Sequence, residues 1–153
     1  MAFSAKVICK QAVDRVKNMV NGAIWMASHE VVVGAEGEHS EFLYLHERGV
    51  PSRNIPPRPV LGPALSQKDI KKIMSRCMRQ AMFNAIVKGD VKGAKNEMEK
   101  AGMVGRDACK KYITDGTHLA PNSPYTIAKK GSSIPLIDTG AMLNSITYEV
   151  RRK

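Results

Sequence analysis

The sequence predicts an α+β fold, in which a small, mostly antiparallel β-sheet packs against a long αα-hairpin and an N-terminal helix. Residues 66–114 carry an apolar stripe at helical spacing that is broken once, near Gly89. A second helical pattern opens the chain, and short strand-like runs lie at residues 31–33 and 146–150. We find no internal repeat and no domain boundary, so residues 1–153 are predicted to form a single domain.

The hairpin is predicted from apolar spacing and from residues that start and end helices. Ser66 followed by Asp69 resembles a capping box at the start of the first helix. Gly89 ends that helix, and Asp90 can cap the second one. The apolar stripe of the first helix consists of Ile70, Ile73, Met74, Cys77, Met78, Ala81, Met82 and Ile86. The second helix has many small residues on its inner face, which allow the partner helix to approach closely: Val91, Ala94, Met98, Ala101, Gly102, Gly105, Ala108, Tyr112 and Ile113.

An N-terminal helix is predicted before the hairpin. Ser4 can cap it, and the helical pattern runs to about Ala27, which takes Trp25 into the core. The apolar residues along one side of this helix are Ile8, Ala12, Val16, Met19, Val20 and Ala23.

Strands and a stiff connection are predicted between this helix and the hairpin. Residues 31–33 are β-branched and typical of a strand, and residues 35–40 form a polar turn. Residues 41–48 carry apolar groups on both sides of an extended chain, which predicts a second, largely covered strand. Five prolines within residues 49–65 then indicate a structural connector, in preference to a ligand for an aromatic-lined groove.

After the hairpin, the chain is predicted to pass through a long loop into a brief helix and a final strand. Residues 115–133 form the loop, and a loop of this length is usually functional or flexible. The D-T-G run at residues 138–140 is predicted to open the helix, with Asp138 as its cap. Alternation over residues 146–150 predicts a half-buried strand.

The net charge of +10 is distributed unevenly along the chain. Residues 18–47 contain five glutamates and no lysine or arginine, whereas residues 66–113 contain 12 basic and five acidic residues. An acidic patch on one copy could therefore meet a basic patch on the next, as in a ring-forming interface. The alternative is that these charges are solvated faces without a partner. The residues predicted for the two patches are Glu36, Glu38, Glu41, Lys71, Lys72, Arg76 and Arg79.

Cysteine usage and hydropathy favour a protein made in the cytoplasm. Cys9, Cys77 and Cys109 are an odd number without metal-ligand spacing, and the last two lie on apolar helix faces. We interpret those two as buried thiols in a reducing compartment. No apolar run approaches the ~20 residues of a membrane span, and the N-terminus lacks a signal-peptide pattern.

The sequence shows no recognisable active site, so we predict a non-enzymatic protein without a cofactor or a metal. Glu36, Glu38, His39 and Glu41 could in principle hold a divalent metal, but a solvated acidic loop is the favoured interpretation. The D-T-G run is shared with aspartic proteases, whose chemistry needs two carboxylates in a run of buried strands. Here a helical stretch follows the D-T-G run, which argues against that reading.

Nucleic acid is a second possible partner for a chain this basic. The basic residues of the hairpin could neutralise several phosphates. Phe83 and Tyr112 are the aromatic residues in this region that could stack on bases, and both lie near the inner stripe. Sequence-specific recognition is therefore not predicted. Non-specific proximity to DNA stays possible, and a small basic DNA-binding dimer is the alternative function.

Two stretches together resemble virion morphogenesis proteins of tailed phages. Residues 44–65, YLHERGVPSRNIPPRPVLGPAL, are similar to a segment in which an H-E-x-G turn precedes a P-x-R-P element. Residues 119–150, LAPNSPYTIAKKGSSIPLIDTGAMLNSITYEV, are similar to an ending with P-L-x-D-T-G followed by S-I-x-Y-x-V. The resemblance covers about residues 31–150 and includes a helical pair between the two motifs. The matching motif residues are Pro57, Arg58, Pro59, Asp138, Thr139 and Gly140, which we interpret as structural.

This resemblance implies a structural protein of the virion neck, where a DNA-filled capsid joins its tail. The family includes tail-completion and neck proteins, commonly six-fold rings, so the resemblance implies a homo-oligomeric ring, with a hexamer as the expected size. Its other partners would be neck, connector and tail proteins, and it would assemble in the host cytoplasm. Some related proteins place the D-T-G segment before the proline-rich element, whereas here it comes last. Tail completion, tail termination and a head-side connector therefore all stay open.

Overall fold

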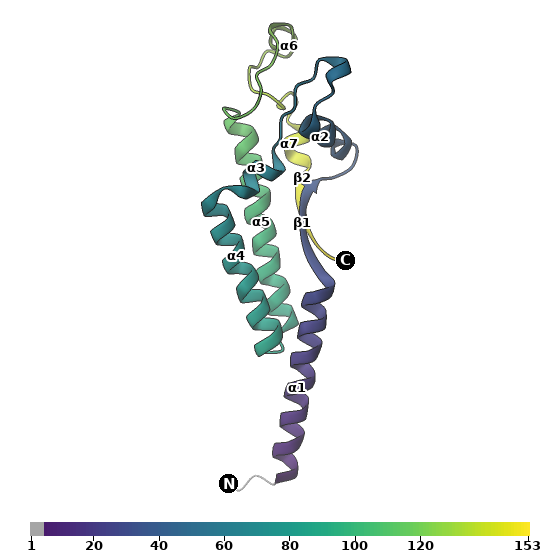
Figure 1. Ribbon diagram of the computed structural model, residues 1–153, viewed down its shortest axis with the longest axis vertical. Coiled ribbons are helices and arrows are strands. Elements are labelled where there is room, and N and C mark those ends of the chain that lie inside the picture. The colour runs from purple at the N-terminus through teal and green to yellow at the C-terminus, as the bar shows by residue number, and fades with distance from the viewer. Residues whose placement is uncertain (1–4) are drawn as a thin grey trace.

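The computed structural model describes residues 5–153, with side chains from residue 9 onward. Ser4, the predicted cap of the first helix, and the side chain of Ile8 lie outside the described part of the chain. Figure 1 shows an elongated molecule in which α1 extends beyond the end of the α4–α5 hairpin. The elements are α1 (Ala5–Ser28), β1 (His29–Ala35), α2 (His39–Arg48), η1 (Pro51–Arg53), α3 (Leu61–Ser66), α4 (Lys68–Met82), η2 (Phe83–Val87), α5 (Val91–Asp115), α6 (Pro124–Lys130), α7 (Ala141–Ser145) and β2 (Ile146–Arg152).

The predicted hairpin is confirmed. Helix α4 continues into the π-helical turn η2, and α5 returns alongside α4. Gly89 has a φ of +67°, the left-handed conformation that glycine adopts without strain. Asp90 caps α5, because its Oδ1 accepts a hydrogen bond of 2.8 Å from the amide of Gly93. A single glycine and one cap therefore define the turn.

The predicted capping box at the start of α4 is wrong. Ser66 is the last residue of α3, and Gln67 occupies the N-cap position of α4 without a side-chain hydrogen bond. The preceding residues are apolar and form a helical turn of their own, which buries Ala64 completely and packs on α5. This burial determines where α3 ends, and it overrides the local capping signal.

The fold is α+β, as predicted. Strands β1 and β2 form a two-stranded antiparallel sheet in which His29 pairs with Arg152 and Ala35 pairs with Ile146. Figure 1 shows this ribbon lying along α5, and the predicted strands at residues 31–33 and 146–150 are both part of it. The ribbon therefore pairs the segment that follows α1 with the C-terminal segment.

The second strand predicted at residues 41–48 is wrong, because this segment is helix α2. Its charges suit a helix, with Glu41 in the first turn and Arg48 in the last. Leu43 is the buried residue of α2, and Gly49, with a φ of +72°, ends the helix. A strand with apolar residues on both sides needs other elements to cover both of its faces. Only one face of this segment is covered, and a helix meets that condition.

Two glycines of α5 are buried, as predicted: Gly102 faces the sheet, and Gly105 faces β1, α3 and Met74 of α4. A methyl group on Gly102 would overlap the ring of Tyr148 in β2. On Gly105 it would come within 3.0 Å of Val33 in β1 and 3.1 Å of Leu65 in α3. The small residues therefore bring the β-ribbon onto the surface of α5.

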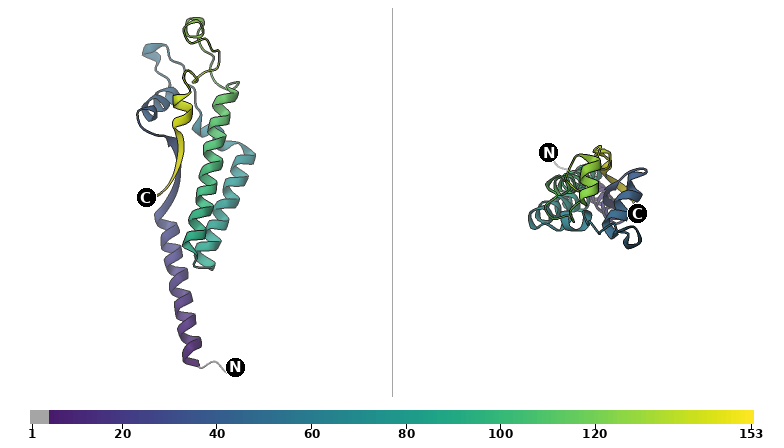
Figure 2. Two further views of the ribbon diagram at one scale, coloured as in Figure 1. Left: turned by 180° about the vertical axis from the view of Figure 1, so that it is seen from behind. Right: turned by 90° about the horizontal axis from the view of Figure 1, so that it is seen from above.

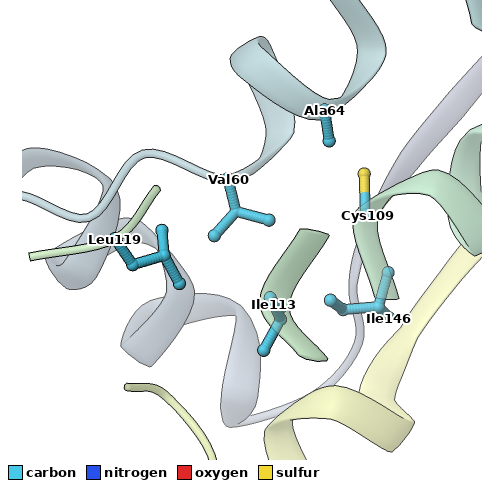
Figure 3. Close-up of a cluster of buried hydrophobic side chains, with 6 residues drawn as sticks. All are labelled: Val60, Ala64, Cys109, Ile113, Leu119 and Ile146. Carbon is cyan, nitrogen blue, oxygen red and sulfur yellow. The ribbon is translucent and has the colours of Figure 1, made fainter. Parts of the chain in front are cut away.

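The largest buried cluster joins the helices to the ribbon. Figure 3 shows its side chains converging from α3, α5, β2 and the segment after α5. Its members are Val60, Ala64, Cys109, Ile113, Leu119 and Ile146. Cys77 and Cys109 are both buried, as predicted, and burial raises the pKa of the Cys109 thiol to about 11, with a smaller contribution from Glu47.

Helix α1 touches the rest of the domain along part of its length only. Gly22 is buried against the backbone of Ala85 in η2. Trp25 is half-buried and stacks on His29, with ring centroids 4.2 Å apart. Along the predicted apolar side, Val16 and Val20 are exposed, whereas Met19 and Ala23 are half-buried.

The segment predicted as a loop at residues 115–133 contains a short helix, α6. Ser123 caps it by accepting a hydrogen bond from the amide of Thr126 at 3.2 Å. Gly131 ends it in the left-handed conformation. The flexibility of this segment in the free protein stays a prediction. The brief helix expected after residue 140 is confirmed as α7.

The close contact at Gly102 predicts a specific effect on stability. Gly102→Ala should lower the free energy of unfolding by about 1–3 kcal/mol, because Tyr148 and its strand must move away from α5. For a chain of this length, each kcal/mol lowers the melting temperature by about 2–4 °C. Gly62→Ala is the matched control, since a methyl group there meets nothing within 4 Å. Equal melting temperatures for the two variants would contradict this packing.

Candidate functional site

The two sequence motifs meet at one cavity of about 780 Å³. Arg58 reaches it from the proline-rich segment, and Asp138 reaches it from the D-T-G run. His46 of α2 and Lys130 of α6 also line it. The cavity lies at the end of the molecule opposite the free end of α1, among α2, α6 and α7 (Figure 1). Segments far apart in the sequence are thus brought together here.

Arg58 clamps the segment that follows α5. Its side chain is only 7% exposed. Nε donates a 2.7 Å hydrogen bond to the carbonyl oxygen of Ala120, and Nη2 donates one of 2.9 Å to that of Pro121. A longer contact of 3.5 Å joins Nη2 to Oδ1 of Asn122. The planar guanidinium thereby satisfies neighbouring backbone carbonyls with one side chain.

A second clamp holds the proline-rich segment itself. Oε1 of Glu47 accepts hydrogen bonds of 2.7 Å from the amides of both Val60 and Leu61, at the start of α3. The amide of Arg58 donates to the carbonyl oxygen of His46 at 2.6 Å. A carboxylate placed on free amides at a helix N-terminus is favourable. These bonds fix the connector on α2 and support its structural interpretation.

The cavity is electrostatically unusual because four basic side chains line it: His46, Arg53, Arg58 and Lys130. Burial lowers the pKa of His46, and the positive charge of Arg58 lowers it further. Burial also lowers the pKa of Lys130, an effect that Asp138 opposes and Arg58 reinforces. Nζ of Lys130 donates to the carbonyl oxygen of Ile134 at 2.7 Å. The hydrogen bonds of Arg58 and Lys130 are therefore made to the backbone, which suits a structural role.

The D-T-G run acts differently from the prediction. Asp138 does not cap α7, which starts after Gly140 without a side-chain bond at the N-cap position. Instead, Oγ1 of Thr139 accepts a 3.3 Å hydrogen bond from the amide of Ala141. Gly140 has a φ of +81°, so the turn does use glycine's conformational freedom, as predicted. Asp138 lies at the cavity because the turn directs it toward Lys130.

The predicted charge patches occupy two different faces. The acidic residues lie between β1 and α2 and in the first turn of α2, and the basic residues lie on α4. Figures 1 and 2 show α2 and α4 on opposite sides of α5. Within the described part of the chain, none of the seven side chains forms an ion pair. All seven are exposed: Glu36, Glu38, Glu41, Lys71, Lys72, Arg76 and Arg79.

Exposed apolar groups accompany both patches, and the sequence interpretation did not identify them. Beside the acidic residues, Phe42 and Tyr44 are exposed on α2, where Arg48 stacks over the Tyr44 ring at 4.9 Å. On the α4 face, Met74, Met78 and Met82 line a shallow groove with Leu65. The helical spacing of these methionines is visible in the sequence, where it suggests a core.

Among residues 5–153, no group of three or more His, Cys, Asp or Glu side chains is arranged to hold a metal ion. No helix within that same range has the length and apolar character needed to cross a bilayer. The comparisons with known proteins are likewise negative: no family model, no curated protein and no solved structure matches the chain.

Replacing Arg58 should destabilise the cavity end of the protein. Arg58→Leu removes the donor of two partly buried hydrogen bonds, to the carbonyl oxygens of Ala120 and Pro121, and a hydrogen bond to a charged group contributes about 1.5–3 kcal/mol. We expect a lower melting temperature and faster trypsin cleavage after Lys129 and Lys130. Arg53→Leu is the control, because this exposed arginine lines the same cavity. Similar melting and digestion of both variants would contradict the clamp.

His46 should make stability depend on pH. Its pKa in the folded protein lies below the ordinary value of 6.5. At pH values between the folded pKa and 6.5, unfolding is therefore accompanied by the uptake of a proton. The contribution of neutral His46 is present above pH 6.5 and is lost as the pH falls below it. The melting temperature of the parent should therefore fall more between about pH 7.5 and about pH 5 than that of His46→Gln. Parallel pH profiles would show that His46 does not contribute.

Proposed function

We propose that this chain is a structural protein that assembles head-to-tail into a ring at the neck of a tailed-phage virion. The observation that carries the proposal is the placement of acidic and basic patches on opposite faces of one elongated domain. A head-to-tail contact repeated around an axis closes into a ring when the rotation allows it. In such an assembly, the protein provides the shape of each ring segment and the contacts between neighbouring copies.

The two faces are complementary in charge. The acidic face presents Glu36, Glu38 and Glu41, and the basic face presents the lysines and arginines of α4. Within the described residues these side chains form no ion pair, so another molecule can neutralise them. Opposite potentials guide association and register.

Apolar contacts must supply most of the binding energy. Exposed ion pairs contribute only about 0–1 kcal/mol each. Phe42 and Tyr44 next to the acidic residues offer large apolar surfaces, and the methionine groove of α4 offers a deformable counterpart. Both faces thus combine charge with apolar area, which is the usual anatomy of a specific interface.

The position in a virion neck rests on the resemblance described for residues 44–65 and 119–150. The structure brings these two stretches together at the cavity that Arg58 and Asp138 share, which is consistent with their belonging to one folded unit. By the same resemblance, a hexamer is the proposed size, and neck, connector and tail proteins are the proposed neighbours. The proposed role is to complete or terminate the tail and to join it to the DNA-filled capsid.

The alternative function is a small DNA-binding dimer. It is favoured by one observation: Lys72, Arg76 and Arg79 surround a shallow groove on α4. Light scattering and a DNA mobility shift separate the two functions. A ring component should form a large particle and bind DNA weakly, with binding abolished by salt, whereas a DNA-binding dimer should be small and should shift DNA at physiological salt.

Charge reversal should weaken assembly and a matching reversal should restore it. We expect the triple substitution of Glu36, Glu38 and Glu41 to Lys to reduce the assembled fraction, more strongly at low salt, because like charges then face each other. Changing Lys71, Lys72, Arg76 and Arg79 to Glu in the same chain should restore it. Analytical ultracentrifugation measures both effects.

Each set of substitutions made alone is the control for the other. The changed residues are exposed, so the melting temperature of the subunit should stay within about 2 °C of the parent. Unchanged assembly of the triple variant would rule out the acidic face as an interface. Failure of the combined variant to recover would mean that the acidic and basic faces do not meet each other.

A further inference from the structure

Helix α1 carries an apolar stripe that its own domain leaves uncovered. The exposed fractions are 52% for Val13, 59% for Val16, 52% for Val20 and 61% for Ile24. Figure 1 shows the first half of α1 extending away from the hairpin. A contiguous apolar surface of this kind marks an interaction site.

The stripe faces away from the domain even where α1 touches it. Gly22 packs against Ala85, and Asn18 lies against Gly89, so these two positions define the inner side of the helix. Successive residues of an α-helix are about 100° apart, which places Val20 about 160° from Gly22. A tilt of α1 toward the hairpin would therefore bury the polar inner side and leave the stripe exposed.

The spacing of the stripe suits contact with another helix. Apolar residues follow one another at intervals of four, three, four and three positions along the first part of α1. This is the heptad pattern in which a helix packs lengthwise against a similar helix. The heptad positions are Cys9, Val13, Val16, Val20 and Ala23, and the exposed Ile24 lies directly beside Ala23 at the edge of this stripe.

The charges beside the stripe favour parallel pairing with the same helix of another copy over antiparallel pairing. Lys10 and Lys17 lie along one edge of the stripe, and Ala12 and Met19 lie along the other. In a parallel pair, the lysine edge of one helix meets the apolar edge of the next, where the lysine stems can pack. An antiparallel pair would place the lysine edges together. The methionine groove of α4 is a poorer partner, because Lys71 and Arg79 line it.

We infer that α1 of one copy packs in parallel against α1 of a neighbouring copy through the stripe from Cys9 to Ala23. This inference deepens the proposed function and rests on it, since it names a second interface inside the assembly. Cyclic symmetry fits it, because rotation about a ring axis tilts all copies of a helix equally toward that axis. The contact covers the valines that are exposed in the single chain.

The native cysteine provides a direct test. Cys9 is exposed at a heptad position, whereas Cys77 and Cys109 are buried. Parallel pairing places Cys9 of one copy opposite Cys9 of its neighbour at the same heptad position, and a disulfide spans roughly 4.4–6.8 Å between Cα atoms. Mild oxidation of the full-length protein should therefore produce a covalent dimer on a non-reducing gel, and Cys9→Ser should abolish it.

A shifted cysteine distinguishes a real contact from random collision. Gln11 is exposed on the inner side of α1, about 160° from Val13. In the Cys9→Ser background, Gln11→Cys should cross-link at least tenfold more slowly than the parent. Equal rates, or a faster rate for Gln11→Cys, would overturn the inference.

The effect of Val16→Glu tests the apolar stripe itself. Val16 is exposed in the single chain, so this variant should keep the circular dichroism spectrum and the melting curve of the subunit. It should lose at least tenfold in Cys9 cross-linking rate, because each contact would bury a carboxylate. An unchanged cross-linking rate would overturn the inference.

The same samples separate this inference from the proposed function. A ring seen by ultracentrifugation without Cys9 cross-linking overturns the α1 contact and leaves the proposed function in place. Efficient cross-linking in a protein that forms dimers and no ring overturns the ring and supports the α1 contact. If Val16→Glu weakens assembly but the parent forms no Cys9 disulfide, the stripe docks on another surface. That result also overturns α1 pairing.

Discussion

The close contact between α5 and the β1–β2 ribbon is the constraint on which the remaining structure depends. Gly102 and Gly105 present no side chain to the ribbon, so Tyr148 and Val33 rest on the helix surface itself. Ile146 then enters the largest buried cluster (Figure 3). Because α1 is continuous with β1 and α7 with β2, the position of the ribbon determines where both helices point. A larger residue at either glycine would displace all of these elements together.

The same arrangement explains why opposite charges lie on opposite faces. Helix α4 packs on one side of α5, and the ribbon packs on another, so α2, which follows β1, cannot reach α4. Glu47 and Arg58 then hold the connector against α2 and the segment after α5. The charge separation is therefore a result of packing, and it does not depend on the charged residues themselves.

Local signals in the sequence were sufficient where one residue type has one strong preference. Gly89 and Asp90 define a helix boundary by conformation and capping, and the structure confirms both. Ser66 offered a similar signal, but burial of Ala64 determined the boundary there. Residues 41–48 fit either a strand or a helix by apolar content, and tertiary contacts decided between them.

The contacts that build the candidate site are long-range and could not be read from local patterns. The bonds from Arg58 to Ala120 and Pro121 join segments more than sixty residues apart, and nothing in the intervening sequence specifies that pairing. The stripe on α1 was visible as a pattern, but apolar spacing cannot tell an internal partner from an external one. That distinction required the position of Gly22 on Ala85.

The antiparallel register of the ribbon has a mechanical consequence for any force that acts on α1. A force pulling α1 along its length acts on β1 at His29, whereas β2 is held at its opposite end, where Ile146 follows α7. The two strands are then loaded in shear, and hydrogen bonds perpendicular to the strands share the load along all seven paired positions. The ribbon would have to fail as a whole, since no single pair at its end bears the tension alone. Tension on α1 is thus transmitted through the ribbon into the centre of the domain.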